Sequence, residues 1–74
     1  MSGGGTLPVL RLAGDIAAQF RHVPGEEAAV KVADHVRLFW DPRMRAQLRT
    51  QVEREGEHCD PVVRRAAALL AEGA

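Results

Sequence analysis

The chain has 74 residues, and its ten basic and ten acidic side chains give a formal net charge of zero. This balance argues against a general binder of nucleic acid or of membrane surfaces, both of which select strongly basic proteins. Cys59 is the only cysteine, so the sequence offers neither an internal disulfide nor a cysteine-based zinc site. A domain of this size has a small core, which favours a chain that completes its fold on a partner.

Residues 1–5, MSGGG, are predicted to be a flexible start before a single helical domain over residues 6–74. They lack the basic and apolar regions of a secretory signal. No apolar run in the chain approaches the roughly 20 residues needed to cross a bilayer. We therefore expect a cytoplasmic protein with no membrane partner.

Helical periodicity occurs four times along the chain, and strand alternation is not sustained anywhere. The sequence therefore predicts an all-α fold, a small bundle of about four short helices. Their expected ranges are residues 7–21, 26–40, 42–55 and 61–72.

The first predicted helix has Thr6 as its N-cap and Pro8 in its first turn, where a missing N–H is tolerated. Its main apolar stripe at helical spacing consists of Val9, Leu12, Ala13, Ile16 and Phe20. A second face of small and apolar residues lies opposite and consists of Leu7, Leu10, Gly14, Ala17 and Ala18. A helix that is apolar nearly all round is normally buried on both sides. Either another helix of this chain or another subunit is expected to cover this second face.

The second predicted helix opens with two glutamates, which suit a helix N-terminus. Its apolar positions fall within about 120° on a helical wheel. These core-facing positions are Ala29, Val32, Ala33, Val36, Phe39 and Trp40. We predict that both aromatic residues belong to the core by position. Their place at the corner before the third helix still leaves an edge within reach of a partner, and tryptophan is enriched at binding hot spots.

The third and fourth predicted helices both begin at an Asp-Pro pair, Asp41-Pro42 and Asp60-Pro61. The residue before a proline is held in an extended conformation, where aspartate is a good N-cap, and proline suits the first helical position. The third helix is expected to stop near Gly56 and the fourth near Gly73. Their expected core residues are Met44, Leu48 and Val52 in the third helix and Val63, Ala66, Ala67 and Leu70 in the fourth.

Candidate catalytic groups are few. The sequence has no glycine-rich phosphate-binding motif, and Ser2 is its only serine. Cys59 follows His58, but adjacent side chains point in different directions in most backbones, and a lone cysteine is usually structural. We therefore predict that this chain has no catalytic residue, no cofactor-binding residue and no metal ligand, and that it is not itself an enzyme.

Arginines gather where the second helix meets the third. Arg37, Arg43, Arg45 and Arg49 lie within thirteen residues that contain one acid, Asp41, a local balance of +3. Arginine makes bidentate contacts with carboxylates and phosphates, but these side chains are equally suited to a solvated face. The candidate partner-binding residues are Arg37, Trp40, Arg43, Met44 and Arg45 at this corner, with Leu10, Gly14 and Ala17 on the first helix.

Residues 33–45, ADHVRLFWDPRMR, resemble the hallmark of the delta subunit of NAD-dependent, molybdenum-containing formate dehydrogenases. The positions that match the family pattern are Ala33, His35, Val36, Arg37, Phe39, Trp40, Asp41, Pro42, Arg43, Met44 and Arg45. Weaker matches in the first and last helices extend the resemblance to about residues 7–70. The chain departs from the pattern at His58-Cys59 and at Gly14.

The resemblance implies a non-catalytic accessory subunit of a cytoplasmic enzyme that oxidises formate to CO₂ and reduces NAD to NADH. It implies that the large catalytic subunit is the partner. It also implies that molybdopterin guanine dinucleotide with molybdenum, iron–sulfur clusters, FMN and NAD are bound by other subunits, and that none of them is bound by this chain.

Three alternatives remain open at this point. The first alternative is a transient maturation chaperone that helps insert cofactor into the catalytic subunit. The second is a chain that forms a homodimer in isolation. The third alternative is a small helical nucleic-acid-binding module that uses the arginines. Its zero net charge argues against this last alternative.

Overall fold

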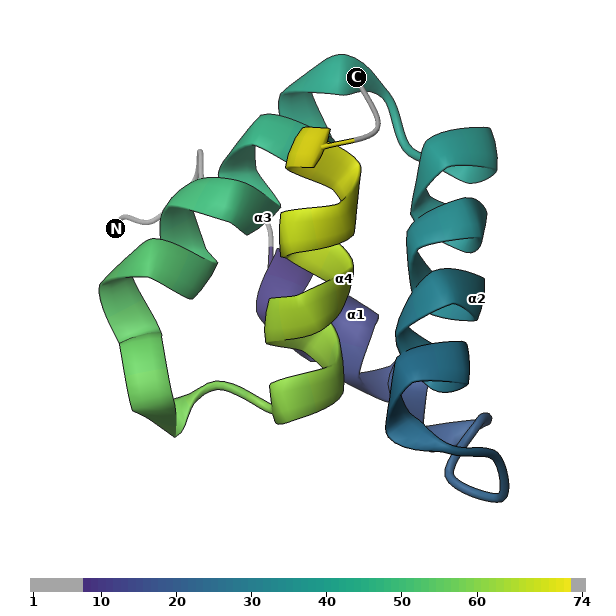
Figure 1. Cartoon of the computed structure of the whole chain (residues 1–74). Coiled ribbons are helices and arrows are strands. Elements are labelled where there is room, and N and C mark those ends of the chain that lie inside the picture. The colour runs from purple at the N-terminus through teal and green to yellow at the C-terminus, as the bar shows by residue number, and fades with distance from the viewer. Residues whose placement is uncertain (1–7, 73–74) are drawn as a thin grey trace.

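A computed structural model describes residues 8–72 of the chain (Figure 1). Its elements are α1 (Val9–Ala18), α2 (Gly25–Phe39), α3 (Pro42–Glu55), the 3-10 helix η1 (Gly56–His58) and α4 (Pro61–Glu72). No strand occurs between residues 8 and 72, so the predicted all-α fold with four helices is confirmed. The predicted flexible residues 1–5, the N-cap at Thr6 and the helix end near Gly73 lie outside the described residues.

Three of the four helices begin and end within one residue of their predicted ranges, and α1 is the exception. We expected α1 to span residues 7–21 with Pro8 in its first turn, but it begins at Val9, directly after Pro8, and ends at Ala18. After that point the chain bonds three residues back, from Gln19 N to Ile16 O and from Phe20 N to Ala17 O, both at 3.0 Å. These tighter bonds replace the α-helical pattern, and the chain then reverses direction to enter α2.

The two Asp-Pro starts are confirmed as helix caps. The Met44 N–H donates to Asp41 Oδ1 at 2.8 Å, and the Val62 N–H donates to Asp60 Oδ1 at the same distance. The Asp41 backbone is extended, with φ −79° and ψ 168°, as the following proline requires. Each aspartate therefore satisfies a backbone donor that the first turn of a helix leaves free.

The helices α2 and α4 lie side by side and run in the same direction (Figure 1). The helix α3 returns from the upper end of α2, and η1 leads into the lower end of α4. The helix α1 passes behind α4 and contacts α2, α3 and α4. The largest fully buried side chains are Leu48, Val9, Val32, Val36 and Val63. Alanines fill most of the remaining core, and their small side chains allow the helices to approach closely.

The second face of α1 is only partly covered by this chain, because Ala18 is exposed and a Cβ added at Gly14 would meet no atom within 4 Å. Ala17 is only 4% exposed and Leu10 packs against the core, whereas Leu12 is 38% exposed. The expected outer position of Ala17 and the expected core position of Leu12 are therefore wrong. Because α1 contacts three helices at once, its buried side is centred on Val9, Ala13 and Ala17 rather than on the line through Leu12.

The two aromatics at the end of α2 have opposite environments. Trp40 is 9% exposed and belongs to the core as predicted, but Phe39 is 73% exposed, and its predicted core position is wrong. Trp40 is the first residue after the helix and has an extended backbone, with φ −98° and ψ 143°. This change of backbone turns its side chain inward. Phe39 stays on the outer side of the last helical turn, where its ring centroid lies 4.8 Å from that of His35.

Candidate functional site

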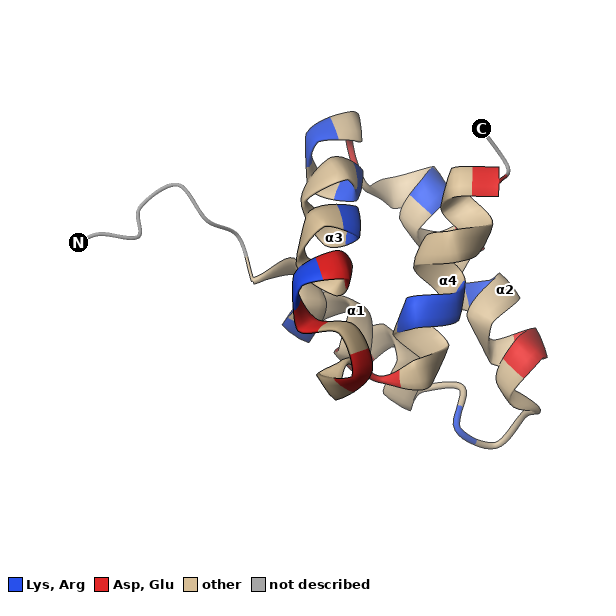
Figure 2. Cartoon of the chain, turned by 60° about the vertical axis from the view of Figure 1, so that its left-hand side comes forward, with Lys and Arg blue, Asp and Glu red and all other residues tan. Residues whose placement is uncertain are grey.

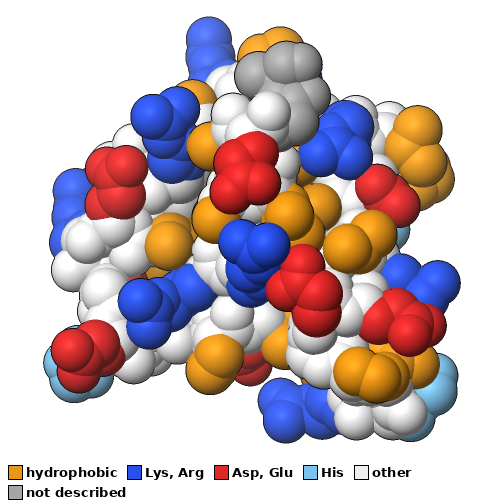
Figure 3. Space-filling model, in the orientation of Figure 1, with side chains coloured by type: hydrophobic (Ala, Val, Ile, Leu, Met, Phe, Trp, Pro, Cys, Tyr) orange, Lys and Arg blue, Asp and Glu red, His pale blue; other side chains and the backbone are white. Residues whose placement is uncertain are grey.

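The upper end of α2 presents apolar side chains to solvent. Leu38 is 77% exposed and stands next to Phe39 in the chain. Hydrophobic side chains protrude from the surface at this end of α2 (Figure 3). Two adjacent large apolar side chains on a surface are a common feature of protein interfaces. We call Leu38 and Phe39 the apolar tip.

A hollow of about 420 Å³ lies beside this corner, between the end of α2, α3 and α4. Three arginines from two helices line it: Arg37 from α2, and Arg45 and Arg49 from α3. Its remaining lining is apolar and consists of Pro42, Ala46, Leu48, Ala67, Leu70 and Ala71. The hollow therefore combines an apolar floor with cationic side chains and contains no carboxylate in its lining. We call it the arginine hollow.

The three arginines of the hollow differ in how their donors are used. Arg37 Nη1 donates to Asp34 Oδ1 at 3.0 Å, and Arg49 Nε lies 3.8 Å from Glu53 Oε2. All four of these side chains are exposed to solvent. Arg45 is half-buried, and its Nε is buried without a hydrogen-bond partner within residues 8–72. A buried N–H without a partner is costly, so the Arg45 side chain is not fully satisfied by the described residues of its own chain.

A second hollow of about 720 Å³ continues from the first along α3 and α4. The two share Arg49, Ala67 and Ala71 in their linings, and the second also includes Arg64 and Arg65. Together they form one surface depression, which we call the α3–α4 groove. Basic residues recur along α3, and acidic residues follow at its lower end (Figure 2).

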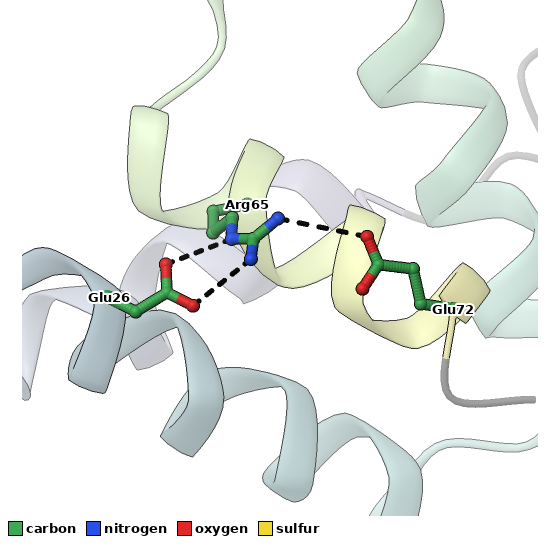
Figure 4. Close-up of polar contacts among 3 residues, drawn as sticks. All are labelled: Glu26, Arg65 and Glu72. Carbon is green, nitrogen blue, oxygen red and sulfur yellow. Dashed lines mark hydrogen bonds and ion pairs between the residues drawn. The ribbon is translucent and has the colours of Figure 1, made fainter.

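Arg65 is held by carboxylates outside the groove lining (Figure 4). Its Nε and Nη2 donate to the two oxygens of Glu26 at 2.9 and 3.2 Å, and its Nη1 lies 3.9 Å from Glu72 Oε2. The hydrogen bond from Arg65 lowers the pKa of Glu26, and the same bond raises the pKa of Arg65. Arg65 thus joins α4 to α2, whereas the arginines of the hollow keep more of their donors for other groups.

The structure brings together only part of the predicted partner-binding set. Arg37 and Arg45 line the arginine hollow, but Arg43 lies in a separate depression of α3 together with Arg54. Met44 is half-buried against the core and Trp40 is buried. The three α1 residues, Leu10, Gly14 and Ala17, line neither hollow of the groove.

Sequence reasoning missed part of this surface. Arg49 was recognised in the arginine cluster but was not assigned to the site, although its spacing of four from Arg45 places both on one helical face. The floor residues Leu48 and Leu70 were assigned to the core alone. No sequence pattern predicted that Leu38 is exposed, because its exposure depends on whether another helix packs against that side of α2.

Catalytic chemistry has little basis in the described residues. Cys59 is buried, and burial together with the neighbouring Asp60 charge raises the pKa of its thiol. The group therefore stays protonated at neutral pH and is a poor nucleophile. No three His, Cys, Asp or Glu side chains within residues 8–72 are grouped as a metal site would need. In the same part of the chain, no helix has the length and apolar character to cross a bilayer.

Comparison with known proteins gives one match. A protein-family model described as NADH-dependent formate dehydrogenase delta subunit FdsD matches residues 9–67. The matched range begins with α1 and ends within α4, and it contains both the apolar tip and the three arginines of the hollow. No curated protein and no solved structure matches the chain.

Proposed function

The chain belongs to the delta subunit family of NADH-dependent formate dehydrogenases, and on this basis we propose that it is a non-catalytic accessory subunit. Its partner in the proposal is the large molybdenum-containing catalytic subunit, and binding supports assembly or activity of the complex in the cytoplasm. The observation that carries the proposal is the exposure of Leu38 and Phe39, which directly follow Arg37 of the arginine hollow in the chain. Large apolar groups beside arginines are typical of binding hot spots.

The small core supports the same proposal. Leu48 is the only leucine among the largest fully buried side chains, and a single core of this size rarely supplies more than about 3–5 kcal/mol of net stability. A partner that binds only the folded chain adds its binding free energy to that stability. A subunit with this core therefore gains much of its stability from the complex.

The described residues do not fit the cofactors that such a complex uses. One buried cysteine and no grouped metal ligands are insufficient for iron–sulfur or molybdenum coordination, which needs several thiolate or other ligands in one place. We therefore assign the molybdenum cofactor, molybdopterin guanine dinucleotide, and the iron–sulfur clusters to the other subunits in this proposal. We propose the same for FMN and NAD on the basis of the family resemblance alone.

The proposal is tested by co-purification with the catalytic subunit. The double variant Leu38→Ala/Phe39→Ala is expected to weaken binding about tenfold or more, because truncating two hot-spot side chains removes at least about 1.4 kcal/mol. Circular dichroism should show an unchanged fold, since both side chains are exposed. Formate oxidation by the purified complex should fall in proportion to the bound subunit.

A matched control is Leu12→Ala/Val30→Ala, which truncates two partly exposed apolar residues elsewhere on the surface. This control should co-purify as the unmodified chain does. Normal co-purification and full activity of the Leu38→Ala/Phe39→Ala variant would contradict the proposal. Recovery of the chain only with the cofactor-free catalytic subunit would instead identify a maturation chaperone.

A further inference from the structure

We infer that the arginine hollow binds an acidic segment of the protein partner in which carboxylates flank an apolar side chain. The carboxylates pair with Arg45 and Arg49, and the apolar side chain packs on the floor around Leu48 and Leu70. The inference rests on the proposed function, because it specifies the chemistry of one part of that partner. It concerns a surface distinct from the apolar tip.

The charges that line the hollow favour an anionic occupant. Three guanidinium groups line it, and no carboxylate does. The contact of Arg49 with Glu53 is exposed and long at 3.8 Å, and exposed pairs of this kind contribute at most about 1 kcal/mol. Arg49 can therefore exchange that contact for a partner carboxylate at low cost.

Arg45 gives the strongest single indication of a ligand. Its Nε has no acceptor among the described residues but is closed off from solvent, so a carboxylate would reach it only if the half-buried side chain shifted toward the hollow that it lines. Arginine and a carboxylate can form two parallel hydrogen bonds, which fixes the orientation of the occupant. An apolar occupant alone would leave the Arg45 donor unsatisfied.

The floor of the hollow favours a peptide over a simple anion. Leu48 and Ala67 are buried beneath it, and the half-buried Leu70 lies at its side. The small side chains of Ala46 and Ala71 leave room for an inserted group. The volume of about 420 Å³ falls in the range of sites with an apolar lining and a few polar groups, roughly 300–1,000 Å³. Inorganic phosphate would use the arginines and none of the apolar floor.

A second copy of this chain is a less suitable occupant. Four of its ten acidic residues lie between Glu53 and Asp60. The apolar side chains of that stretch provide no free anchor, because Cys59 is buried in the core of its own chain. The exposed Leu38 and Phe39 lie between Asp34 and Asp41, but Asp34 already accepts from Arg37 and Asp41 caps α3. A segment whose carboxylates are free, from a different protein, therefore suits the hollow better.

The first experiment measures the affinity of the full chain for the purified catalytic subunit by interferometry at several salt concentrations. The Arg45→Gln/Arg49→Gln variant is expected to bind about tenfold more weakly and to show a flatter dependence on salt. The control Arg54→Gln removes another exposed arginine of α3 that lines neither hollow of the groove, and it should bind within about twofold of the unmodified chain. Circular dichroism checks the fold of each variant.

The outcomes separate this inference from the proposed function. If the Arg45→Gln/Arg49→Gln variant binds normally while Leu38→Ala/Phe39→Ala binds weakly, the inference fails and the proposed function stands. If the unmodified chain does not bind the catalytic subunit, both fail. An equal loss of affinity in Arg54→Gln would show a general charge effect and would also overturn the inference.

A second experiment identifies the occupant directly in the assembled complex. A photo-crosslinking residue, p-benzoylphenylalanine, replaces Ala71, which is exposed and lines both hollows. The same replacement at the exposed Ala18 of α1 is the control. Mass spectrometry should find that Ala71 crosslinks to a partner segment with at least two acidic residues around an apolar one. Crosslinks to a segment without acids, or only to a second copy of this chain, would overturn the inference.

Discussion

At the residue scale, the neighbouring aromatics Phe39 and Trp40 contribute differently: Trp40 to the stability of the fold and Phe39 to the proposed interface. Trp40 is largely buried in the core, so Trp40→Ala removes about 3–5 kcal/mol of stability, comparable to the whole net stability expected of this chain. Loss of partner binding in that variant would therefore reflect unfolding. Phe39 is exposed, and changing it tests the interface without disturbing the core.

The same contrast gives a prediction for two leucines. Leu48→Ala is expected to lower the free energy of unfolding by about 3 kcal/mol, because Leu48 is fully buried and its removal leaves a cavity. Leu38→Ala should change it by less than about 0.5 kcal/mol, because Leu38 is mostly exposed. Urea denaturation of both variants measures these values. Similar losses at the two positions would show that the assigned core is incorrect.

At the element scale, α3 carries its charges in the unfavourable sense for a helix. Arg43 and Arg45 lie in its first turn, and in its last turn Glu53 and Glu55 outnumber the one base, Arg54. A helix N-terminus favours acids and its C-terminus favours bases, by about 0.3–1 kcal/mol for each charge. The Asp41 cap offsets part of this cost, by about 1 kcal/mol. Residues that are unfavourable for the stability of their own helix often belong to functional surfaces. This agrees with a binding role for the arginines of α3.

Substitution of alanine for Gly56 and for Gly14, one at the end of a helix and one inside a helix, should change the stability of the protein in opposite directions. Gly56 ends α3 with φ 55° and ψ −123°, a conformation that side chains strongly disfavour, so Gly56→Ala should destabilise the protein by about 1–3 kcal/mol. Gly14 lies inside α1, and an added Cβ would meet no atom within 4 Å. Gly14→Ala should therefore stabilise the protein by about 0.5–1 kcal/mol. Thermal and urea denaturation measure both effects, and a change of the same sign in the two variants would contradict this account.

The elements were predictable from sequence to the extent that local chemistry determines them. The Asp-Pro pairs at residues 41–42 and 60–61 fix two helix starts through side-chain caps, and the structure places both as expected. The environments of Leu12 and Phe39 depend instead on which helices pack nearby and on the extended backbone at Trp40. The arginine hollow was only partly predictable, because part of its apolar lining comes from α4, which is distant in sequence from Arg37 and Arg45.

At the scale of the whole molecule, Glu26 and Arg65 join the start of α2 to α4 across 39 residues of sequence. Arg65 lowers the pKa of Glu26 below its ordinary value of 4.5. Because the folded pKa is lowered, the contribution of this pair is present above pH 4.5 and is lost as the pH falls through the folded pKa. Arg65→Gln should therefore slightly lower the unfolding midpoint at pH 7 and have a smaller effect at pH 3.

The control for this prediction is Arg64→Gln, which removes an exposed arginine that has no ion pair among the described residues. Its effect on stability should be small and nearly the same at both pH values. Added salt should reduce the Arg65→Gln effect at pH 7, since both partners are exposed to solvent. An effect of Arg65→Gln that is equally large at pH 3 would show that the pair is not its cause.

The order of charges along α3 also affects how the molecule meets other proteins. Four arginines and one acid occupy residues 37–49, whereas four acids and one arginine occupy residues 53–60. The helix macrodipole has the same sense as these side-chain charges, so the two add to an electric dipole along α3 in a molecule without net charge. An acidic surface would exert almost no net pull on such a molecule, but it would exert a torque. The chain would rotate during approach until its arginine end faced that surface, before any contact had formed.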